Sequence, residues 1–327
     1  MTQFFFAAEV FANGLMTGVM YALVALGFVL IYKASGVFNY AQGVLALFAG
    51  LTLVGIMNGQ VPFSHLINAA FGTHLDEFGW NVPSGLAIVL TIGVMILLAI
   101  AIEKLVLQHL VGQAPIILFM ATIGLAYFLE GLGDVMWGAD VKMLDVGIPQ
   151  GISDVVEQTT AAWLGYGFFI DRLDIWATVI AALLVAALVL FAQYTKQGRA
   201  MRAVADDHQA ALSVGISLQF IWILVWSIAG FVALVAGIMW GTKSGVQFSL
   251  SLIALKALPV LMLGGFTSIP GAIVGGLIIG VGEKMFEFWV GPLIGGATEN
   301  WFAYVLALIF LVFRPQGLFG EKIIERV

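Results

Sequence analysis

Nine apolar runs constrain this chain more than any other feature of its sequence. They occupy residues 10–32, 40–57, 84–104, 116–137, 174–194, 218–241, 250–265, 271–290 and 298–313. A helix needs about 20 apolar residues to cross about 30 Å of hydrocarbon, and most of the runs approach or exceed that length. Only 10% of the residues are charged, whereas a soluble domain carries roughly 25%. The sequence therefore predicts an all-α, polytopic transmembrane bundle in which residues 1–327 form a single domain.

The run at 250–265 differs from the other eight because Lys256 and Pro259 interrupt it. A charged residue is costly inside a membrane, and a proline breaks the hydrogen-bond ladder of a helix. The bundle therefore has about nine spans, of which eight are regular and one is short or re-entrant. The distribution of basic residues bears on this choice.

The predicted orientation follows from lysines and arginines in the connections. With nine crossings, one side of the membrane holds Lys33, Lys104, Lys196, Arg199, Arg202, Arg314, Lys322 and Arg326, and the other holds Lys142, Arg172 and Lys243. Basic connections stay in the cytoplasm, so we expect the N-terminus outside and the C-terminus in the cytoplasm. A re-entrant run at 250–265 would place the basic tail outside, so the charges favour nine crossings. Residues 58–83 and 138–173 are then periplasmic loops, either simple connections or landing surfaces for a soluble partner.

The segment at 196–217, KQGRAMRAVADDHQAALSVGIS, is the longest polar, helix-compatible stretch between two apolar runs. Asp206 or Asp207 can cap a second short helix that begins near His208, and Gly215 can end it. This pattern predicts a pair of cytoplasmic surface helices that press against a soluble partner. The alternative is a basic loop that only fixes the topology.

The sequence contains no pattern typical of catalysis. The nearest approach to a phosphate loop is GIMWGTKS at 237–244, in which Thr242 separates the glycine from the lysine, so another chain would have to hydrolyse any ATP. The chain has no cysteine, and its histidines lack metal-ligand spacing. We therefore expect a non-catalytic membrane protein with no cofactor, no metal and no nucleic-acid partner.

Polar residues inside the apolar runs are candidates for a translocation pathway because their insertion is costly. Glu130 and Lys256 lie deepest, and they could pair with each other, line an aqueous path, or do both. Asn39 and Gln42 give the second run an unusually polar start. Their hydrogen bonds could hold a broken helix, or the side chains could face a solute.

Small residues at intervals of four predict close helix contacts. They are Gly14 and Gly18 in the first run and Gly271, Gly275, Gly276 and Gly280 in the eighth. The spacing does not say whether the neighbouring helix belongs to the same chain. The eighth run also carries Glu283, Lys284 and Glu287 near its predicted outer end, where we expect them to reach water by snorkelling.

Four segments together resemble the LivH-type permease of branched-chain amino-acid ABC importers. They are FNYAQG at 38–43, RAMRAVADDHQAALSVGI at 199–216, GGFTSIPGAIVGG at 264–276 and FRPQGLFG at 313–320. The resemblance covers essentially the whole chain in the same order. It implies a multi-pass subunit of the bacterial inner membrane, paired with a LivM-type permease. It also implies two cytoplasmic ATP-binding subunits and a periplasmic solute-binding protein as partners.

The resemblance assigns the segment 196–217 to coupling with the ATPase. The implied coupling residues are Arg199, Arg202, Asp206, Asp207, Ala210, Ala211 and Gly215. Gln209 stands where the family's loop has Glu, and Gln42 stands where many members have His. The expected solute is a branched-chain amino acid or a related small polar molecule such as urea, an amide or an aromatic acid. The rival interpretations are an ion-coupled secondary transporter that uses Glu130 and a passive channel for a small solute.

Overall fold

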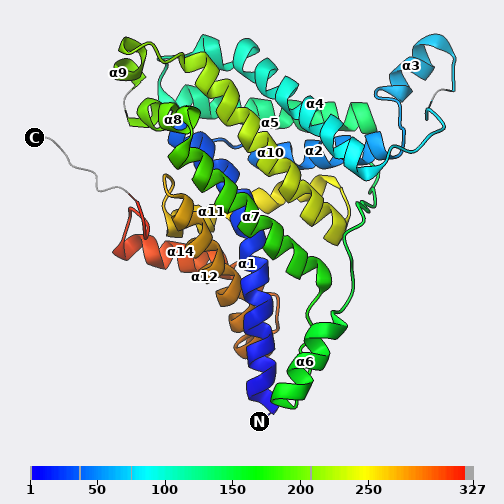
Figure 1. Cartoon of the computed structure of the whole chain (residues 1–327), viewed down its shortest axis with the longest axis vertical. Coiled ribbons are helices and arrows are strands. Elements are labelled where there is room, and N and C mark those ends of the chain that lie inside the picture. The colour runs from blue at the N-terminus through cyan, green and yellow to red at the C-terminus, as the bar shows by residue number, and fades with distance from the viewer. Residues whose placement is uncertain (1, 37, 75, 207, 321–327) are drawn as a thin grey trace, which may run out of the picture. The chain divides into compact units, whose positions relative to one another are not determined.

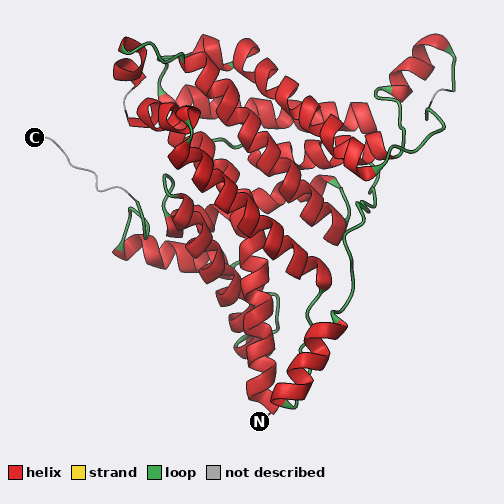
Figure 2. Cartoon of the chain, in the orientation of Figure 1, coloured by secondary structure: helices red, strands yellow, loops and turns green. Residues whose placement is uncertain are grey.

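The computed structural model describes residues 2–36, 38–74, 76–206 and 208–320, and every regular element in these ranges is a helix. Figure 2 shows this all-helical architecture, which confirms that the fold is all-α. Nine apolar helices coincide one for one with the nine predicted runs (Figure 1). They are α1 (Thr2–Ser35), α2 (Gln42–Met57), α4 (Ser84–Leu105), α5 (Pro115–Trp137), α7 (Arg172–Tyr194), α10 (Leu218–Ser244), α11 (Ile253–Gly264), α12 (Ile269–Trp289) and α14 (Phe302–Phe313).

Six of these helices, namely α1, α4, α5, α7, α10 and α12, are long and apolar enough to cross a membrane. The other three, α2, α11 and α14, have 16, 12 and 12 residues. At about 1.5 Å per residue, a 12-residue helix covers only about 18 Å of the roughly 30 Å hydrocarbon layer. The total of about nine crossings and the orientation of the termini therefore remain predictions.

Shorter helices occupy the connections between the apolar ones. The two long predicted loops carry α3 (Ser64–Phe71) and α6 (Asp154–Leu164), and the segment 196–217 carries α8 (Lys196–Asp206) and α9 (His208–Ser213). The remaining short elements are η1 (Leu107–Leu110), η2 (Phe248–Leu252), α13 (Gly291–Ile294) and η3 (Thr298–Asn300). Each long loop is therefore partly helical.

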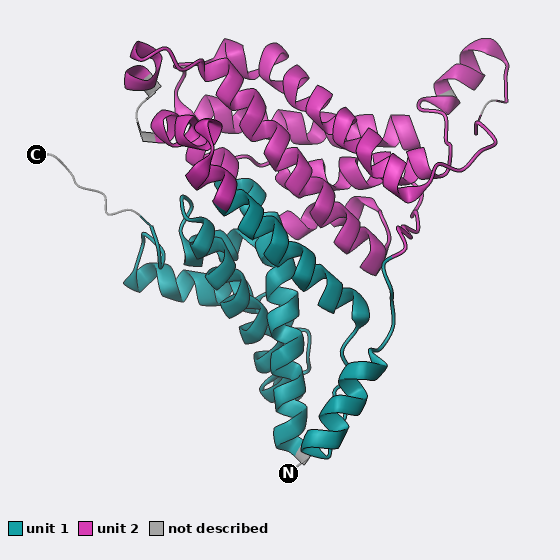
Figure 3. Cartoon of the chain, in the orientation of Figure 1, with its two compact units in different colours: residues 1–29, 148–189, 255–327 teal, residues 30–147, 190–254 magenta. Residues whose placement is uncertain are grey.

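The chain folds into two compact units, each assembled from separated segments (Figure 3). Unit 1 contains residues 1–29, 148–189 and 255–327, and unit 2 contains residues 30–147 and 190–254. Each unit has a helical core of its own.

The core of unit 2 is built around α2 and α10. Every residue of α2 from Gln42 to Gly55 is buried, as expected for a helix that is apolar on all sides. Gly237 of α10 lies so close to α2 that a Cβ at this position would come within 2.5 Å of the Ala46 carbonyl oxygen. Helices α4 and α5 also pack on α2. The short helix α2 is therefore covered by three longer ones.

The core of unit 1 contains a glycine contact between α1 and α12. A Cβ added to Gly276 would come within 2.5 Å of the Gly18 carbonyl oxygen, and one added to Gly280 would meet the backbone of Gly14 at the same distance. Such close backbone approach requires residues without side chains. The neighbour of these two α12 glycines is therefore a helix of the same chain.

A second glycine contact joins α12 to α11. A Cβ at Gly275 would lie 2.5 Å from the Val260 carbonyl oxygen, and one at Gly271 would overlap the backbone of Gly264. The two glycine pairs of α12 thus serve two different neighbours, α1 and α11. This arrangement fixes the register of the three helices relative to one another.

Candidate coupling and transport sites

Helices α8 and α9 form the helix pair predicted in segment 196–217. Gly215 has a φ of +83°, in the left-handed region that glycine tolerates best. Its N–H donates to the Leu212 carbonyl, and the N–H of Ile216 donates to the Ala211 carbonyl, each at 3.0 Å. These two bonds are the Schellman closure of a helix end. Gly215 therefore terminates the segment's second helix, as its sequence predicts.

The surface of the α8–α9 pair combines positive charge with uncovered apolar groups. Arg199 and Arg202 of α8 are exposed, and Leu212 and Val214 expose 53% and 74% of their surface. Among the other predicted coupling residues, Ala210 is exposed, Ala211 is buried, Asp206 ends α8, and Asp207 lies outside the described residues. Exposed apolar side chains beside polar ones are typical of a protein contact surface.

The polar start of α2 is held by hydrogen bonds within unit 2. Asn39 is fully buried, and its Oδ1 accepts from the N–H of Ala41 at 3.1 Å. Gln42 is 1% exposed, and its Nε2 donates to the Ala229 carbonyl of α10 at 3.4 Å. Among the described residues, Asn39 Nδ2 and Gln42 Oε1 have no hydrogen-bond partner. Buried polar atoms are normally satisfied, so these two remain available to water or a solute.

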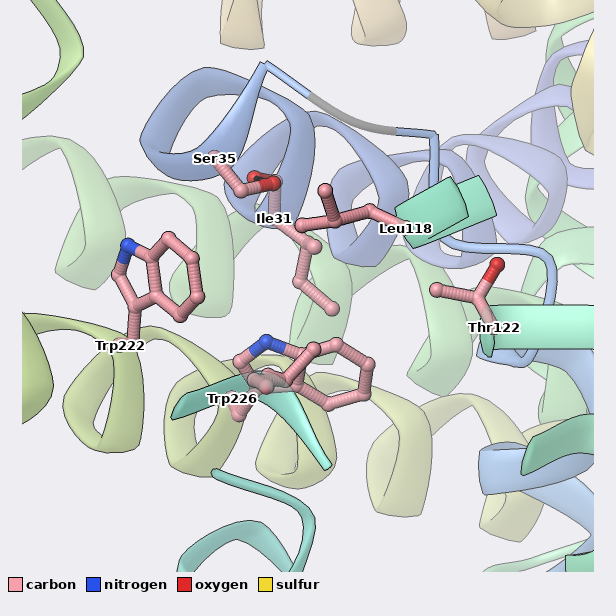
Figure 4. A pocket seen from close by; sticks show the side chains of 7 residues that line it. Ile31, Ser35, Leu118, Thr122, Trp222 and Trp226 are labelled. Carbon is pink, nitrogen blue, oxygen red and sulfur yellow. Dashed lines mark hydrogen bonds between the residues drawn. The ribbon is translucent and has the colours of Figure 1, made fainter. Parts of the chain in front are cut away.

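A small cavity in unit 2 lies next to the segment that precedes α2. Thr122 of α5 accepts from the Tyr40 N–H at 3.1 Å and also lines the cavity, with Trp222 and Trp226 of α10 (Figure 4). The volume is about 10 Å³, which suffices for one water molecule. As it stands, the cavity is too small to hold an amino acid.

Lys256 of α11 belongs to a polar cluster in unit 1. Its ammonium donates to the Tyr21 hydroxyl and to the Glu299 backbone carbonyl, each at 3.2 Å. It also lies 3.6 Å from a carboxylate oxygen of Glu283 and 5.5 Å from the centre of the Tyr21 ring. The ammonium therefore has a carboxylate, a hydroxyl, a carbonyl and an aromatic face around it.

Glu283 corrects a prediction made for α12. The sequence suggests that this carboxylate snorkels to water, but its side chain is completely buried. It accepts a hydrogen bond from the Tyr21 hydroxyl at 2.9 Å. The glycine contacts turn this face of α12 towards α1 and α11, so the side chain cannot reach solvent. The carboxylate within ion-pair distance of Lys256 is that of Glu283, which the sequence did not suggest as its partner. Glu130, the partner that was considered, is a half-buried residue of unit 2.

The other two charged residues of α12 also have partners in unit 1. Lys284 forms a 2.9 Å ion pair with Glu299, and each of these side chains is 32% exposed. Glu287 accepts from the backbone N–H and the hydroxyl of Thr298, at the start of η3. These bonds tie the connection between α12 and α14 to the polar cluster.

Sequence reasoning missed three members of this cluster, namely Tyr21, Glu283 and Glu299. The usable signal was the acidic residue in GVGEKMF, because a charge within an apolar run marks a functional or structural partner by default. Glu103 was missed as well. It is 1% exposed within α4, and one of its carboxylate oxygens has no hydrogen-bond partner among the described residues.

The family model described as "Branched-chain amino acid transport system / permease component" matches residues 10–314. This chain belongs to that family. The match begins within α1 and ends directly after α14, so it includes both units of the permease and both candidate sites.

Curated relatives align with the permease over most of its length. BraD of Pseudomonas aeruginosa, a high-affinity branched-chain amino acid transport system permease protein, is 28% identical over 100% of both chains. LivH of Escherichia coli K12, which carries the same description, is 26% identical over 99% of both. The fructose import permease protein FruF of Bifidobacterium longum is 26% identical over 90% of this chain and 75% of its own. Similar permeases are thus described for solutes of different chemistry.

Proposed function

We propose that this permease is the transmembrane subunit of an ATP-driven importer for branched-chain amino acids or a related small polar solute. The observation that carries the proposal is the α8–α9 helix pair, which joins the long apolar helices α7 and α10 and leaves basic and apolar side chains uncovered. A membrane subunit that does not itself bind ATP needs such a contact surface so that conformational changes of an ATPase can move its helices. The descriptions of BraD and LivH support the choice of solute.

The proposed assembly contains partners that supply what this chain lacks. A LivM-type permease would complete the membrane part as a heterodimer, and two cytoplasmic ATP-binding subunits would dock on α8–α9 of this chain and the equivalent surface of its mate. A periplasmic solute-binding protein would deliver the solute to the opposite face of the bacterial inner membrane. Residues 1–327 then act as one permease domain with Asn39, Gln42, Glu130 and Lys256 along the pathway.

The proposed cycle converts closure of the ATPases into movement of helices. Displacing α8–α9 would pull on the ends of α7 and α10 and switch the pathway between outward-facing and inward-facing states. The ATPase can shift this equilibrium only by contacting α8–α9 differently in the two states. The α8–α9 surface is therefore expected to be essential for transport and dispensable for membrane insertion.

Reconstitution tests the proposal directly. The complete transporter in proteoliposomes, with its solute-binding protein outside and ATP inside, should take up radiolabelled L-leucine and should stop when ATP is replaced by a non-hydrolysable analogue. Uptake that continues without ATP and collapses when the ion gradients are dissipated would instead identify an ion-coupled transporter. Uptake that only equilibrates the solute would identify a channel.

The proposed topology can be tested with single cysteines, because the chain has none of its own. With nine crossings, Asp154→Cys and Leu293→Cys should react with a membrane-impermeant maleimide in intact cells, and Gln209→Cys should react only after permeabilisation. Leu293 is 81% exposed, so the reagent can reach it. Labelling at 154 without labelling at 293 would show that α11 re-enters instead of crossing. Labelling at 209 alone in intact cells would show an inverted orientation.

A further inference from the structure

Among the described residues, the Lys256 ammonium makes two hydrogen bonds of normal length, and its third N–H has only a longer contact. Two of its N–H groups donate to the uncharged oxygens of Tyr21 and the Glu299 backbone. Among the described residues, its remaining close acceptor is Glu283, at 3.6 Å, which is longer than a normal charge-assisted hydrogen bond of about 2.7–2.9 Å. The Lys256 side chain is 27% exposed. The ammonium is therefore held by protein groups while its side chain stays partly exposed.

A partly exposed carboxylate accompanies this ammonium. The Glu299 backbone carbonyl accepts a hydrogen bond from Lys256, and the Glu299 carboxylate forms an ion pair with Lys284. A single residue thus links the accessible ammonium of Lys256 to an accessible carboxylate, 32% exposed. Because the Lys256 ammonium contacts the Glu299 backbone, the Glu299 carboxylate is no farther from it than one hydrogen bond plus the length of a glutamate residue. An α-amino acid likewise carries its ammonium and carboxylate on one residue.

We propose that Lys256 and Glu299 form the site that recognises the head group of a zwitterionic solute. Lys256 donates to the solute carboxylate, and the Glu299 carboxylate accepts from the solute ammonium. Tyr21 and Glu283 are positioning residues, because the buried Glu283 carboxylate orients the Tyr21 hydroxyl, which in turn holds the Lys256 ammonium. This inference rests on the proposed function and adds the residues that would select the solute.

The charges of the cluster favour a zwitterion over a neutral or singly charged solute. Lys256 with Glu283 and Lys284 with Glu299 make two neutral pairs. A zwitterion adds no net charge, and each of its ends meets a group of opposite sign. A sugar or urea carries no charge, so it would gain no charge–charge attraction from Lys256 or Glu299.

The mildest test of the site is Tyr21→Phe, which removes one hydroxyl and no charge. Hydrogen bonds to charged groups are strong enough that their loss should weaken L-leucine binding about tenfold. Binding is measured on the complete transporter in nanodiscs without the solute-binding protein, so that the affinity belongs to the membrane subunits. Lys243→Met, which removes an exposed lysine from α10 in unit 2, is the matched control and should bind as wild type does.

The decisive variant is the double substitution Lys256→Met/Glu283→Gln. Lys256→Met alone would leave the buried Glu283 carboxylate without its ion-pair partner. Removing both partners avoids this uncompensated charge, so the transporter should assemble. Assembled double variant should lose L-leucine binding about a hundredfold, and L-leucinamide, which lacks the carboxylate, should compete poorly against L-leucine in wild type. Glu299→Gln should weaken L-leucine more than 4-methylpentanoate, which lacks the ammonium.

Each result bears on the inference separately from the proposed function. Wild-type L-leucine affinity in Tyr21→Phe, or in assembled double variant, would overturn the head-group site while leaving the importer intact. Equal competition by L-leucine and L-leucinamide would overturn it as well, and so would ATP-driven uptake of fructose in place of L-leucine. If the wild-type transporter takes up none of the tested solutes in an ATP-dependent way, the proposed importer function itself is contradicted.

Discussion

Gly276→Leu should prevent assembly of the transporter. Gly276 lies where α12 meets α1, and any Cβ there would come within 2.5 Å of the Gly18 carbonyl oxygen. Overpacking usually costs about 1–3 kcal/mol, but here the obstacle is backbone, which cannot rotate away. A cost of several kcal/mol is a large part of a total stability of about 5–15 kcal/mol. The yield of monodisperse complex after size-exclusion chromatography in detergent should fall at least about tenfold.

The matched control is Gly93→Leu in α4. Gly93 is also a helical glycine, but a Cβ there would meet open space. This variant should purify as wild type does, because only helix propensity changes, and it changes in the favourable direction. Equal yields from Gly276→Leu and Gly93→Leu would show that α1 and α12 are not packed through their glycines.

Gly215→Val should disconnect ATP hydrolysis from uptake in a transporter that still assembles. The residue has a φ of +83°, which a β-branched side chain adopts only at a cost of about 1–3 kcal/mol. The Schellman closure after α9 should therefore open and displace the α8–α9 surface. We expect uptake to fall at least about tenfold, with loss of the ATPase stimulation caused by loaded solute-binding protein.

Gly215→Asn tests whether the left-handed backbone conformation at this position, and not glycine as such, is what coupling requires. Asparagine accepts the left-handed region more readily than other residues with side chains, so this variant should keep most of its uptake. Normal stimulation and uptake in Gly215→Val would contradict the coupling role of the α9 end. Low membrane levels of Gly215→Val would instead assign the turn to folding.

The sequence was sufficient to locate the apolar helices because each is determined by a local pattern. Apolar runs bounded by glycine, proline or charged residues coincide with all nine apolar helices, and Gly215 ends α9 as expected. Pro259 did not prevent helix formation, since α11 continues through it. The paired contacts of Gly276 and Gly275 with two different helices needed the structure, because spacing alone cannot name a neighbour.

The polar cluster was largely unpredictable for the same reason. Lys256 stood out because a lysine in an apolar run is costly, but its partner depends on the rotation of α12. That rotation follows from backbone contacts made by glycines, which carry no charge or hydropathy signal. The sequence therefore suggested Glu130 as the acidic partner of Lys256 and predicted that Glu283 reaches water. In the fold, Glu283 is buried and accepts a hydrogen bond from Tyr21.

The interleaving of the two units has a consequence for biosynthesis. Unit 2 is complete once residue 254 has been made, but unit 1 needs the segment 255–327. Tyr21 and Glu283 are separated by 262 residues, so at about 5–20 residues per second α1 waits about 13–50 seconds for α12. During that interval the glycine face of α1 must be shielded by lipid or by the insertion machinery. A ribosomal pause after residue 254 would lengthen this exposure and favour degradation of the nascent permease.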